Sequence, residues 1–285
     1  MAVKILTDST SYIDESLKRE LDIKTVSLNI LFDGENFKEM EIDNESFYKM
    51  MEEKGIPTSS QPSVNDLYKM MKEVVEKGDD LIGIFISSEM SGTYSSAVMV
   101  REMILEEYPE ARIEIIDSRS NCMQLGFAVV TAARAAKEGK GIAEIKEVAE
   151  ENIKRSRFLF IPHNLDYLKK GGRIGGASAL IGNILKIIPI LTVENGKTTI
   201  LSKVRTKKNA VITMVDKLIE DMKNYGLKEL VVHHINCYDE ALELVNLIKE
   251  KISIDINISS IGPVIGTHVG PRAIGIVYYT ERNIR

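Results

Sequence analysis

Residues 81–100 read LIGIFISSEMSGTYSSAVMV, and they indicate the fold class. The first six residues are apolar apart from one glycine, as in a parallel strand buried on both faces. A loop rich in hydroxyl groups follows at 87–93, and apolar residues then recur at helical spacing. Strand, loop and helix in this order predict one repeat of a doubly wound α/β domain.

The same order of elements occurs on both sides of this stretch. An apolar run at 3–6 ends in the polar segment 7–11, and another at 113–116 ends in Asp117 and Ser118 before an alanine-rich helix over 122–137. Further predicted elements are a strand at 25–31 and a helix that begins with a capping-box-like pair at Ser63 and Asp66 and ends near Gly78. We therefore expect an N-terminal domain at residues 1–158 with a mostly parallel sheet.

The pattern changes at Phe158. Asn195-Gly196 between two extended runs is a strong hairpin signal. The remaining predicted elements are helices at 211–222 and 241–248 and strands at 158–161, 230–233, 254–258 and 274–279. A hairpin with crossing helices predicts a C-terminal α+β domain at residues 159–285.

Charge and composition exclude several classes of protein. With 37 basic and 42 acidic side chains the net charge is -5, so no global positive field attracts nucleic acid or an anionic bilayer. Cys122 and Cys237 are the two cysteines, far apart in the chain, which indicates neither a disulfide framework nor a zinc cluster. A reducing, cytoplasmic setting fits this usage.

The apolar segments are too short or too interrupted for the membrane. The first run is too short for a signal peptide. The longest later candidate, at 177–193, is interrupted by Gly182, Asn183, Lys186 and Pro189. We therefore expect no membrane span.

No catalytic signature is present. The sequence lacks a G-x-S-x-G elbow, a phosphate-binding P-loop, H-E-x-x-H and a G-x-G-x-x-G after the first strand. His233 and His234 are adjacent on a predicted strand, where neighbouring side chains face opposite ways, so a multi-histidine metal site is not expected. We expect no metal, no cofactor and no catalytic residues.

Hydroxyl groups gather in three segments, at 7–11, 58–63 and 87–96. Two of these follow predicted parallel strands and the third precedes a helix, and ligands of open parallel sheets bind beyond the carboxyl ends of strands, near helix N-termini that favour anions. A shared anion site is one explanation. The other is that these residues serve only as helix caps and turn formers, which the residues alone leave open.

The residue types also bear on the anion. Tight phosphate sites usually contain Lys or Arg, and none of the three segments does. Neutral hydroxyls suit a monoanionic head group better. Such a head group binds modestly, so its ligand needs an apolar body, and a long acyl tail supplies about 10 kcal/mol before ordering costs.

The ordered set of motifs resembles that of the DegV family over essentially the whole chain. These motifs are TDST at 7–10, SSQPS at 59–63, ISSEMSGTY at 86–94, DS at 117–118, LKKGGRI at 168–174 and THVGP at 267–271. The resemblance implies a bacterial two-domain protein that binds one long-chain fatty acid, such as palmitate, stearate or oleate, between its domains. It also implies that the protein is not itself an enzyme but presents the acid to the ATP-binding subunit of a fatty acid kinase, which makes acyl phosphate.

Site residues follow from the same resemblance. Ser59 and Ser60 match a hydroxyl pair that contacts the fatty-acid carboxylate, with Ser59 in place of the usual Thr. Ser91 and His268 match two further carboxylate-binding positions. Arg173 matches an arginine near the surface on which the kinase docks.

One position departs from the family pattern, which has Gly where this chain has Arg272. If the position requires a positive φ, Arg costs about 1 kcal/mol of backbone strain or diverts the loop. It also introduces a cation near the expected carboxylate. Both the head-group geometry and kinase docking are therefore in question at this position.

Two other functions compete with the fatty-acid carrier. The first is an enzyme that acts on a small phosphorylated or carboxylated metabolite, with His268 as acid or base. The second is a structural or regulatory module in which the pocket is vestigial. Chain length and unsaturation of the acid, the identity of the kinase and the oligomeric state are not specified by the sequence.

Overall fold

The computed structural model describes residues 2–180 and 187–284. The chain forms two compact units, a first of Met1–Glu41 with Ser59–Ile153 and a second of Ile42–Thr58 with Lys154–Arg285. This division differs from the expected boundary between residues 158 and 159. The chain passes into the second unit after Ile153, and it also visits that unit once near its start.

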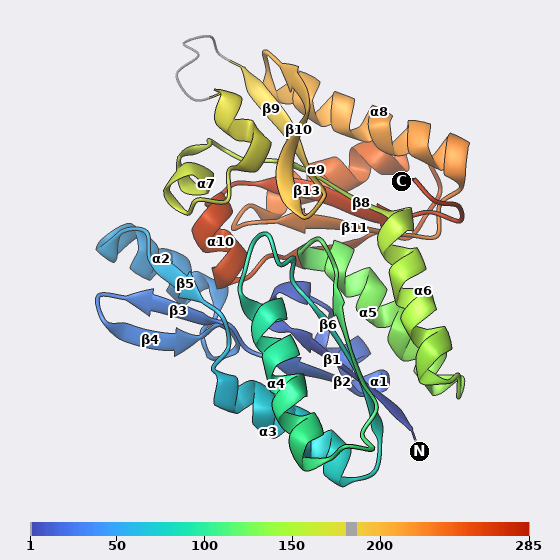
Figure 1. The fold of residues 1–285 in the computed structure, drawn as a ribbon. Coiled ribbons are helices and arrows are strands. Elements are labelled where there is room, and N and C mark those ends of the chain that lie inside the picture. Colours follow the sequence, from blue (N-terminus) through green and yellow to red (C-terminus); the bar gives the residue numbers. More distant parts are fainter. Residues whose placement is uncertain (1, 181–186, 285) are drawn as a thin grey trace. The chain divides into compact units, whose positions relative to one another are not determined.

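The first unit contains a four-stranded sheet in the order β2-β1-β6-β7 (Figure 1). Its strands are β1 (Val3–Asp8), β2 (Ile23–Val26), β6 (Asp80–Phe85) and β7 (Ile113–Asp117). All neighbours are parallel. The predicted parallel sheet is confirmed, and the carboxyl ends of its strands lie along one edge.

Helices cover both faces of this sheet, as a doubly wound fold requires (Figure 1). On one face lie α3 (Val64–Glu76) and α4 (Thr93–Glu107), whose buried residues include Leu67 and Val100 and share a core with Leu6 and Phe85 of the sheet. On the other face lies α5 (Cys122–Lys137), which contacts β1 and β6 and is almost wholly buried. The unit also contains α1 (Glu15–Glu20), η1 (Ser9–Ser11), η2 (Glu39–Glu41) and most of α6 (Ile142–Arg155).

A separate three-stranded sheet has the order β4-β3-β5. Its strands are β3 (Asn29–Phe32), β4 (Glu35–Lys38) and β5 (Thr58–Ser60). The single strand predicted at 25–31 is therefore wrong, because the chain leaves the parallel sheet after Val26. Leu28 lies between β2 and β3, and its N–H donates to Ser9 Oγ at 3.0 Å instead of to the backbone of a neighbouring strand.

The second unit contains a six-stranded sheet in the order β10-β9-β8-β13-β11-β12 (Figure 1). Its strands are β8 (Ser156–Ile161), β9 (Ile188–Glu194), β10 (Lys197–Val204), β11 (Glu229–His234), β12 (Asn257–Ser260) and β13 (Ile274–Tyr279). Only the β11–β12 pair is parallel. Asn195 and Gly196 both have positive φ, at 50° and 81°, and form the predicted turn between β9 and β10.

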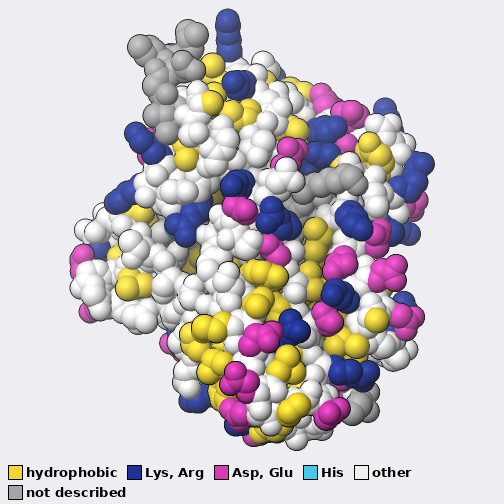
Figure 2. Space-filling view, viewed as in Figure 1, with side chains coloured by type: hydrophobic (Ala, Val, Ile, Leu, Met, Phe, Trp, Pro, Cys, Tyr) yellow, Lys and Arg dark blue, Asp and Glu magenta, His cyan; other side chains and the backbone are white. Residues whose placement is uncertain are grey.

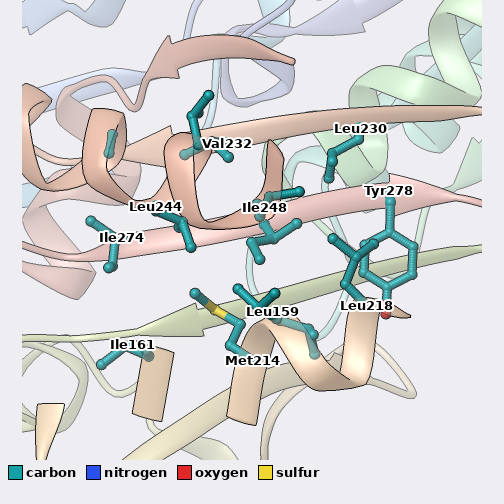
Figure 3. Packing of buried hydrophobic residues seen from close by; sticks show 14 of the residues in the cluster. Leu159, Ile161, Met214, Leu218, Leu230, Val232, Leu244, Ile248, Ile274 and Tyr278 are labelled. Carbon is teal, nitrogen blue, oxygen red and sulfur yellow. The ribbon is translucent and has the colours of Figure 1, made fainter. Parts of the chain in front are cut away.

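Two long helices close the core of this unit. They are α8 (Lys207–Tyr225) and α9 (Tyr238–Lys249). Met214 and Leu218 of α8 and Leu244 and Ile248 of α9 pack with residues of the sheet, among them Tyr278 (Figure 3). The expected α+β architecture is confirmed.

Three further helices belong to the second unit, α2 (Asn44–Lys54), α7 (Asp166–Lys170) and α10 (Pro263–Val269), with η3 (Gly175–Leu180) after α7. Asn44 Nδ2 donates to Ser260 Oγ at 2.7 Å and to the Ile261 carbonyl at 3.2 Å. Tyr48 lies so close to Gly266 that a Cβ there would overlap its hydroxyl. These contacts explain why α2 groups with the C-terminal part of the chain.

No helix within the described residues is long and apolar enough to cross a bilayer. Part of the candidate at 177–193, residues 181–186, lies outside the described residues. Basic and acidic side chains are interspersed on the face that Figure 2 shows. Hydrophobic side chains also reach the surface where α4 lies, and Met99 and Met103 are among the exposed ones.

Candidate functional site

The loop that carries Ser91 follows β6 in the first unit. Ser87 is fully buried, and its carbonyl accepts the N–H groups of Met90 at 2.9 Å and of Ser91 at 3.0 Å. Its hydroxyl accepts the Glu89 N–H at 3.2 Å. Ser87 therefore folds the loop into a tight turn that presents Ser91 directly before α4.

Ser91 is half-buried and well placed to donate a hydrogen bond. Its Oγ accepts the Thr93 N–H at 3.3 Å and lies 2.9 Å from Thr93 Oγ1. When the Thr93 hydroxyl donates to Ser91, the proton of Ser91 can point to an acceptor outside the loop. Thr93 itself is fully buried.

The N-terminus of α4 adds to the same environment. Its N-cap residue is Gly92, which has no side chain with which to cap the helix, and its first turn contains no acidic residue. Ser91 Oγ accepts the first N–H of the helix, that of Thr93. The first N–H groups of a helix lack partners within the helix and carry partial positive charge. Together with the Ser91 hydroxyl, this end of α4 favours an anion with neutral donors.

Ser59 and Ser60 end β5 and lead toward α3. Ser59 is half-buried and Ser60 is exposed. A few residues later, Ser63 Oγ accepts the Asp66 N–H at 3.0 Å and is the N-cap of α3, as predicted. The segment is therefore pinned on its carboxyl side by the start of a helix.

Gln61 links this segment to the Ser91 loop. Its Nε2 donates to Ser96 Oγ on α4 at 2.6 Å, and its backbone carbonyl accepts Asn29 Nδ2 at 3.0 Å. In the sequence, Gln61 stands only as one letter of a motif, and no role for it is predicted. Within the first unit, the structure thus brings the segments of Ser59, Ser60 and Ser91 together.

Many other hydroxyls serve the fold. Ser9 Oγ donates to the buried carboxylate of Glu39, and Ser88 Oγ donates to Asp117 Oδ2 at 2.6 Å. Thr10 Oγ1 donates to Asp8 Oδ1 at 2.5 Å. For Ser9 and Thr10 of the segment at 7–11, the explanation as turn formers therefore accounts for these contacts. Thr7 Oγ1 of the same segment is buried without a hydrogen-bond partner among the described residues.

Asp8 joins two strand ends beneath the site. Its carboxylate is fully buried and accepts the N–H of Ile86 at 2.7 Å and of Thr10 at 3.0 Å. Burial raises the pKa of Asp8, although these hydrogen bonds oppose the shift. Asp8 thereby holds the end of β1 beside the end of β6, from which the Ser91 loop departs.

His268 and Arg173 lie together in the second unit. His268, on α10, is packed so closely on Gly171 that a Cβ there would overlap the imidazole. Arg173 Nη1 donates to the Gly171 carbonyl at 2.7 Å. Burial, and then the positive charge of Arg173, lower the pKa of His268 to about 4, so the imidazole is neutral at pH 7.

The sequence does not indicate this pairing. The motifs imply a role at the carboxylate for His268 and a role at a docking surface for Arg173, whereas the structure places the two side chains in one electrostatic neighbourhood. The charge of Arg173 therefore affects the pKa of His268, whatever else Arg173 does.

Arg272 adopts the left-handed conformation that the family's Gly suggested. Its φ is 63°, and its N–H donates to the Ile235 carbonyl at 2.7 Å. Its guanidinium is turned to Glu240, with Nη2 and Oε1 2.9 Å apart. The cation introduced by this departure is thus paired with an acidic side chain of α9.

Within residues 2–180 and 187–284, no group of three or more His, Cys, Asp or Glu side chains is arranged to hold a metal ion. His233 is fully buried, with Nδ1 3.0 Å from the Ser259 carbonyl. Burial lowers the pKa of His233 to about 4 and raises that of the Cys122 thiol. These groups are core residues.

Comparison with known proteins agrees with the motifs and the fold. A DegV domain-containing protein of Clostridium acetobutylicum is 63% identical over 285 residues, which cover both chains fully. A crystal structure of DegV, a fatty acid binding protein from Bacillus subtilis, superposes with a TM-score of 0.87 at 33% identity, covering 98% of this chain and 99% of that one. A DegV family protein from Thermus thermophilus, described for its fatty acid binding, has a TM-score of 0.89 at 26% identity, covering 98% and 100%. The family model matches residues 2–281, and the chain belongs to the DegV family.

Proposed function

We propose that this protein binds one long-chain fatty acid and carries it to a separate kinase subunit. Ser59, Ser60 and Ser91 bind the carboxylate, and His268 is a further carboxylate ligand. The observation that carries the proposal is the N-terminus of α4, where Gly92 supplies no side-chain cap, Ser91 lies directly before it, and Gln61 ties the Ser59–Ser60 segment beside it.

The chemistry of these donors supports a monoanion. Hydroxyl and backbone N–H groups stabilise one negative charge without the Lys or Arg that a phosphate dianion usually needs. A hydrogen bond to a charged acceptor contributes about 1.5–3 kcal/mol, so a few of them bind a carboxylate modestly. The burial of an acyl tail then supplies most of the affinity, at about 0.8 kcal/mol for each CH2.

The relatives support the same ligand class. The Bacillus subtilis and Thermus thermophilus proteins are both described as fatty acid binding, and each aligns over nearly the whole of this chain. The kinase step is inferred from the resemblance of the whole set of motifs to the DegV family, in which Arg173 matches an arginine near the docking surface of the kinase. In this step the carrier supplies the acid, and on the partner that binds ATP the carboxylate oxygen accepts the terminal phosphoryl group of ATP, which forms acyl phosphate and releases ADP.

Native mass spectrometry tests the ligand. Protein purified from bacterial cells should carry an added mass that matches a C14 to C18 acid, and delipidated protein should bind oleate in a 1:1 complex. Protein that carries no lipid and does not bind oleate contradicts the proposal, and turnover of a small metabolite by that protein would support the enzyme alternative.

Ser91→Ala tests the head-group site. The substitution removes one hydrogen bond to a charged acceptor, worth about 1.5–3 kcal/mol, and should weaken oleate binding roughly 10- to 150-fold. It also removes the contacts of Ser91 Oγ with Thr93, so the melting temperature should fall while the fold stays intact. Ser95→Ala is the matched control, because Ser95 is an exposed serine in the first turn of the same helix. Equal affinities for the two variants would place the carboxylate elsewhere.

A further inference from the structure

Gln61 lies between the two segments that hold the proposed donors, and it is bonded on both sides. Its side-chain Nε2 donates to Ser96 Oγ at 2.6 Å, and Ser96 is 8% exposed. Its backbone carbonyl accepts Asn29 Nδ2 at 3.0 Å, and Asn29 is 9% exposed. The residue is thus anchored to α4 by its side chain and to β3 by its backbone.

Gly92 is the complement of Gln61. A Cβ built at Gly92 would overlap Gln61 Oε1, although the backbone of Gly92, at φ −73° and ψ −2°, accepts any residue. Glycine is therefore required at position 92 because the Gln61 amide needs the space, and not because the backbone needs a conformation that only glycine adopts. The amide of Gln61 fills the surface where a side chain at Gly92 would otherwise stand.

Gln61 and Gly92 are each adjacent in sequence to the proposed carboxylate donors. Ser59 and Ser60 directly precede Gln61, and Ser91 directly precedes Gly92. The contact between Gln61 and Gly92 therefore sets how the two hydroxyl segments lie relative to each other. Several weak neutral donors bind one carboxylate well only if their geometry is fixed before the ligand arrives. Otherwise the entropy lost when the two segments become ordered on binding weakens the affinity.

We propose that Gln61 is a positioning residue, which holds the Ser59–Ser60 segment and the Ser91 loop in the arrangement that binds a carboxylate. The inference rests on the proposed function, since it concerns the same head group. Gln61 acts through its neighbours and does not contact the ligand.

The first test compares oleate with its methyl ester. Gln61→Ala should weaken oleate binding about tenfold. Without Gln61 the two serine segments are no longer held together, and about one of their hydrogen bonds to the carboxylate should be lost. It should change methyl oleate binding less than about twofold, because the ester buries the same tail without a charged head group. An equal loss for both ligands would mean that Gln61 merely supports the fold, and unchanged oleate binding would mean that it has no role; both results overturn the proposal.

The second test uses the fit between Gln61 and Gly92. In the wild-type background, Gly92→Ala should weaken oleate binding, because the new methyl group displaces the Gln61 amide. In the Gln61→Ala background, the same substitution should cost less than about twofold, since the space is then vacant. Additive losses in the double variant would overturn the proposal even if Gln61→Ala alone reduced stability.

Different results would contradict fatty-acid binding and the positioning role of Gln61. Wild-type protein that does not bind oleate would overturn the proposed function and this inference with it. Wild-type protein that binds oleate, with Gln61→Ala binding it equally well, would overturn this inference alone.

Discussion

Burial determines the charge of His268, and this has a measurable effect on stability. In the unfolded chain its pKa is about 6.5, whereas in the folded protein it is lowered to about 4. Between these values the unfolded state binds a proton that the folded state does not, so the free energy of unfolding falls as the pH falls. The full difference is about 3 kcal/mol, complete near pH 4.

His268→Gln should therefore flatten the pH dependence of stability. In urea unfolding between pH 7 and pH 4.5, the variant should lose less stability than wild type, although not all of the slope, because burial also lowers the pKa of His233 to about 4. His163→Gln is the control, since His163 is exposed. Parallel curves for wild type and His268→Gln would contradict a neutral His268.

Single residues differ in how far the sequence reveals them. The sequence predicts Ser63 as a helix cap because capping is local, and the structure confirms it. The role of Gln61 depends on Ser96 and Gly92, which follow in a different segment, so no local pattern indicates it. The proximity of His268 and Arg173 is likewise a result of tertiary packing.

At the scale of elements, strongly patterned segments are predicted well. The helix predicted over 122–137 is α5, and the strand predicted over 274–279 is β13. Both are continuous, buried segments whose composition leaves little choice of structure. The run at 81–86, apolar apart from one glycine, likewise identifies β6, one of the two central strands of the parallel sheet.

Elements whose ends depend on tertiary contacts are predicted less well. The strand expected at 25–31 is divided between two sheets, because Ser9 accepts the Leu28 N–H across the chain. The strand expected at 254–258 is β12, which begins later and ends at Ser260. It pairs with β11 in the parallel direction, and that register is set by its partner rather than by its own pattern.

Ser63, the N-cap of α3, should contribute measurably to the stability of the protein. Ser63→Ala removes the acceptor of the Asp66 N–H and should lower the free energy of unfolding by about 1 kcal/mol. Urea denaturation at pH 7 measures the change. Asn65→Ala, at an exposed position in the first turn, is the control and should be neutral or slightly stabilising, because Ala has the higher helix propensity. Equal effects of the two changes would argue against the cap.

For the whole molecule, the sequence predicts two parts with different architectures, and the parallel and mixed sheets confirm both fold classes. What it does not predict is the path of the chain, which enters the second unit at Ile42 and returns at Ser59. A change in the pattern of predicted strands and helices marks one boundary along the chain. The short segment 42–58, which contains only α2 and the start of β5, produces no such change. Asn44 and Tyr48 make the contacts that place α2 there.

The proposed division of labour between carrier and kinase predicts that carrying and presenting the acid are separable. Arg173→Ala should leave the oleate affinity within about threefold of wild type, since the proposed carboxylate donors are Ser59, Ser60, Ser91 and His268. It should reduce acyl phosphate formation about tenfold or more when a DegV-associated kinase subunit and ATP are supplied, because loss of one partner of an interfacial charge pair costs about 2–5 kcal/mol where the pair is buried.

Arg173 also lowers the pKa of His268, so its removal should shift that pKa upward and the pH dependence of stability with it. This shift is a signature of the substitution that is independent of any partner. Lys170→Ala is the matched control, because it removes an exposed positive charge from the end of α7 in the same motif. If Arg173→Ala lost oleate binding and acyl phosphate formation in equal measure, Arg173 would belong to the fatty-acid site through His268 rather than to a docking surface. If Lys170→Ala reduced acyl phosphate formation as strongly as Arg173→Ala, the partner would respond to the charge of the segment and not to the Arg173 side chain.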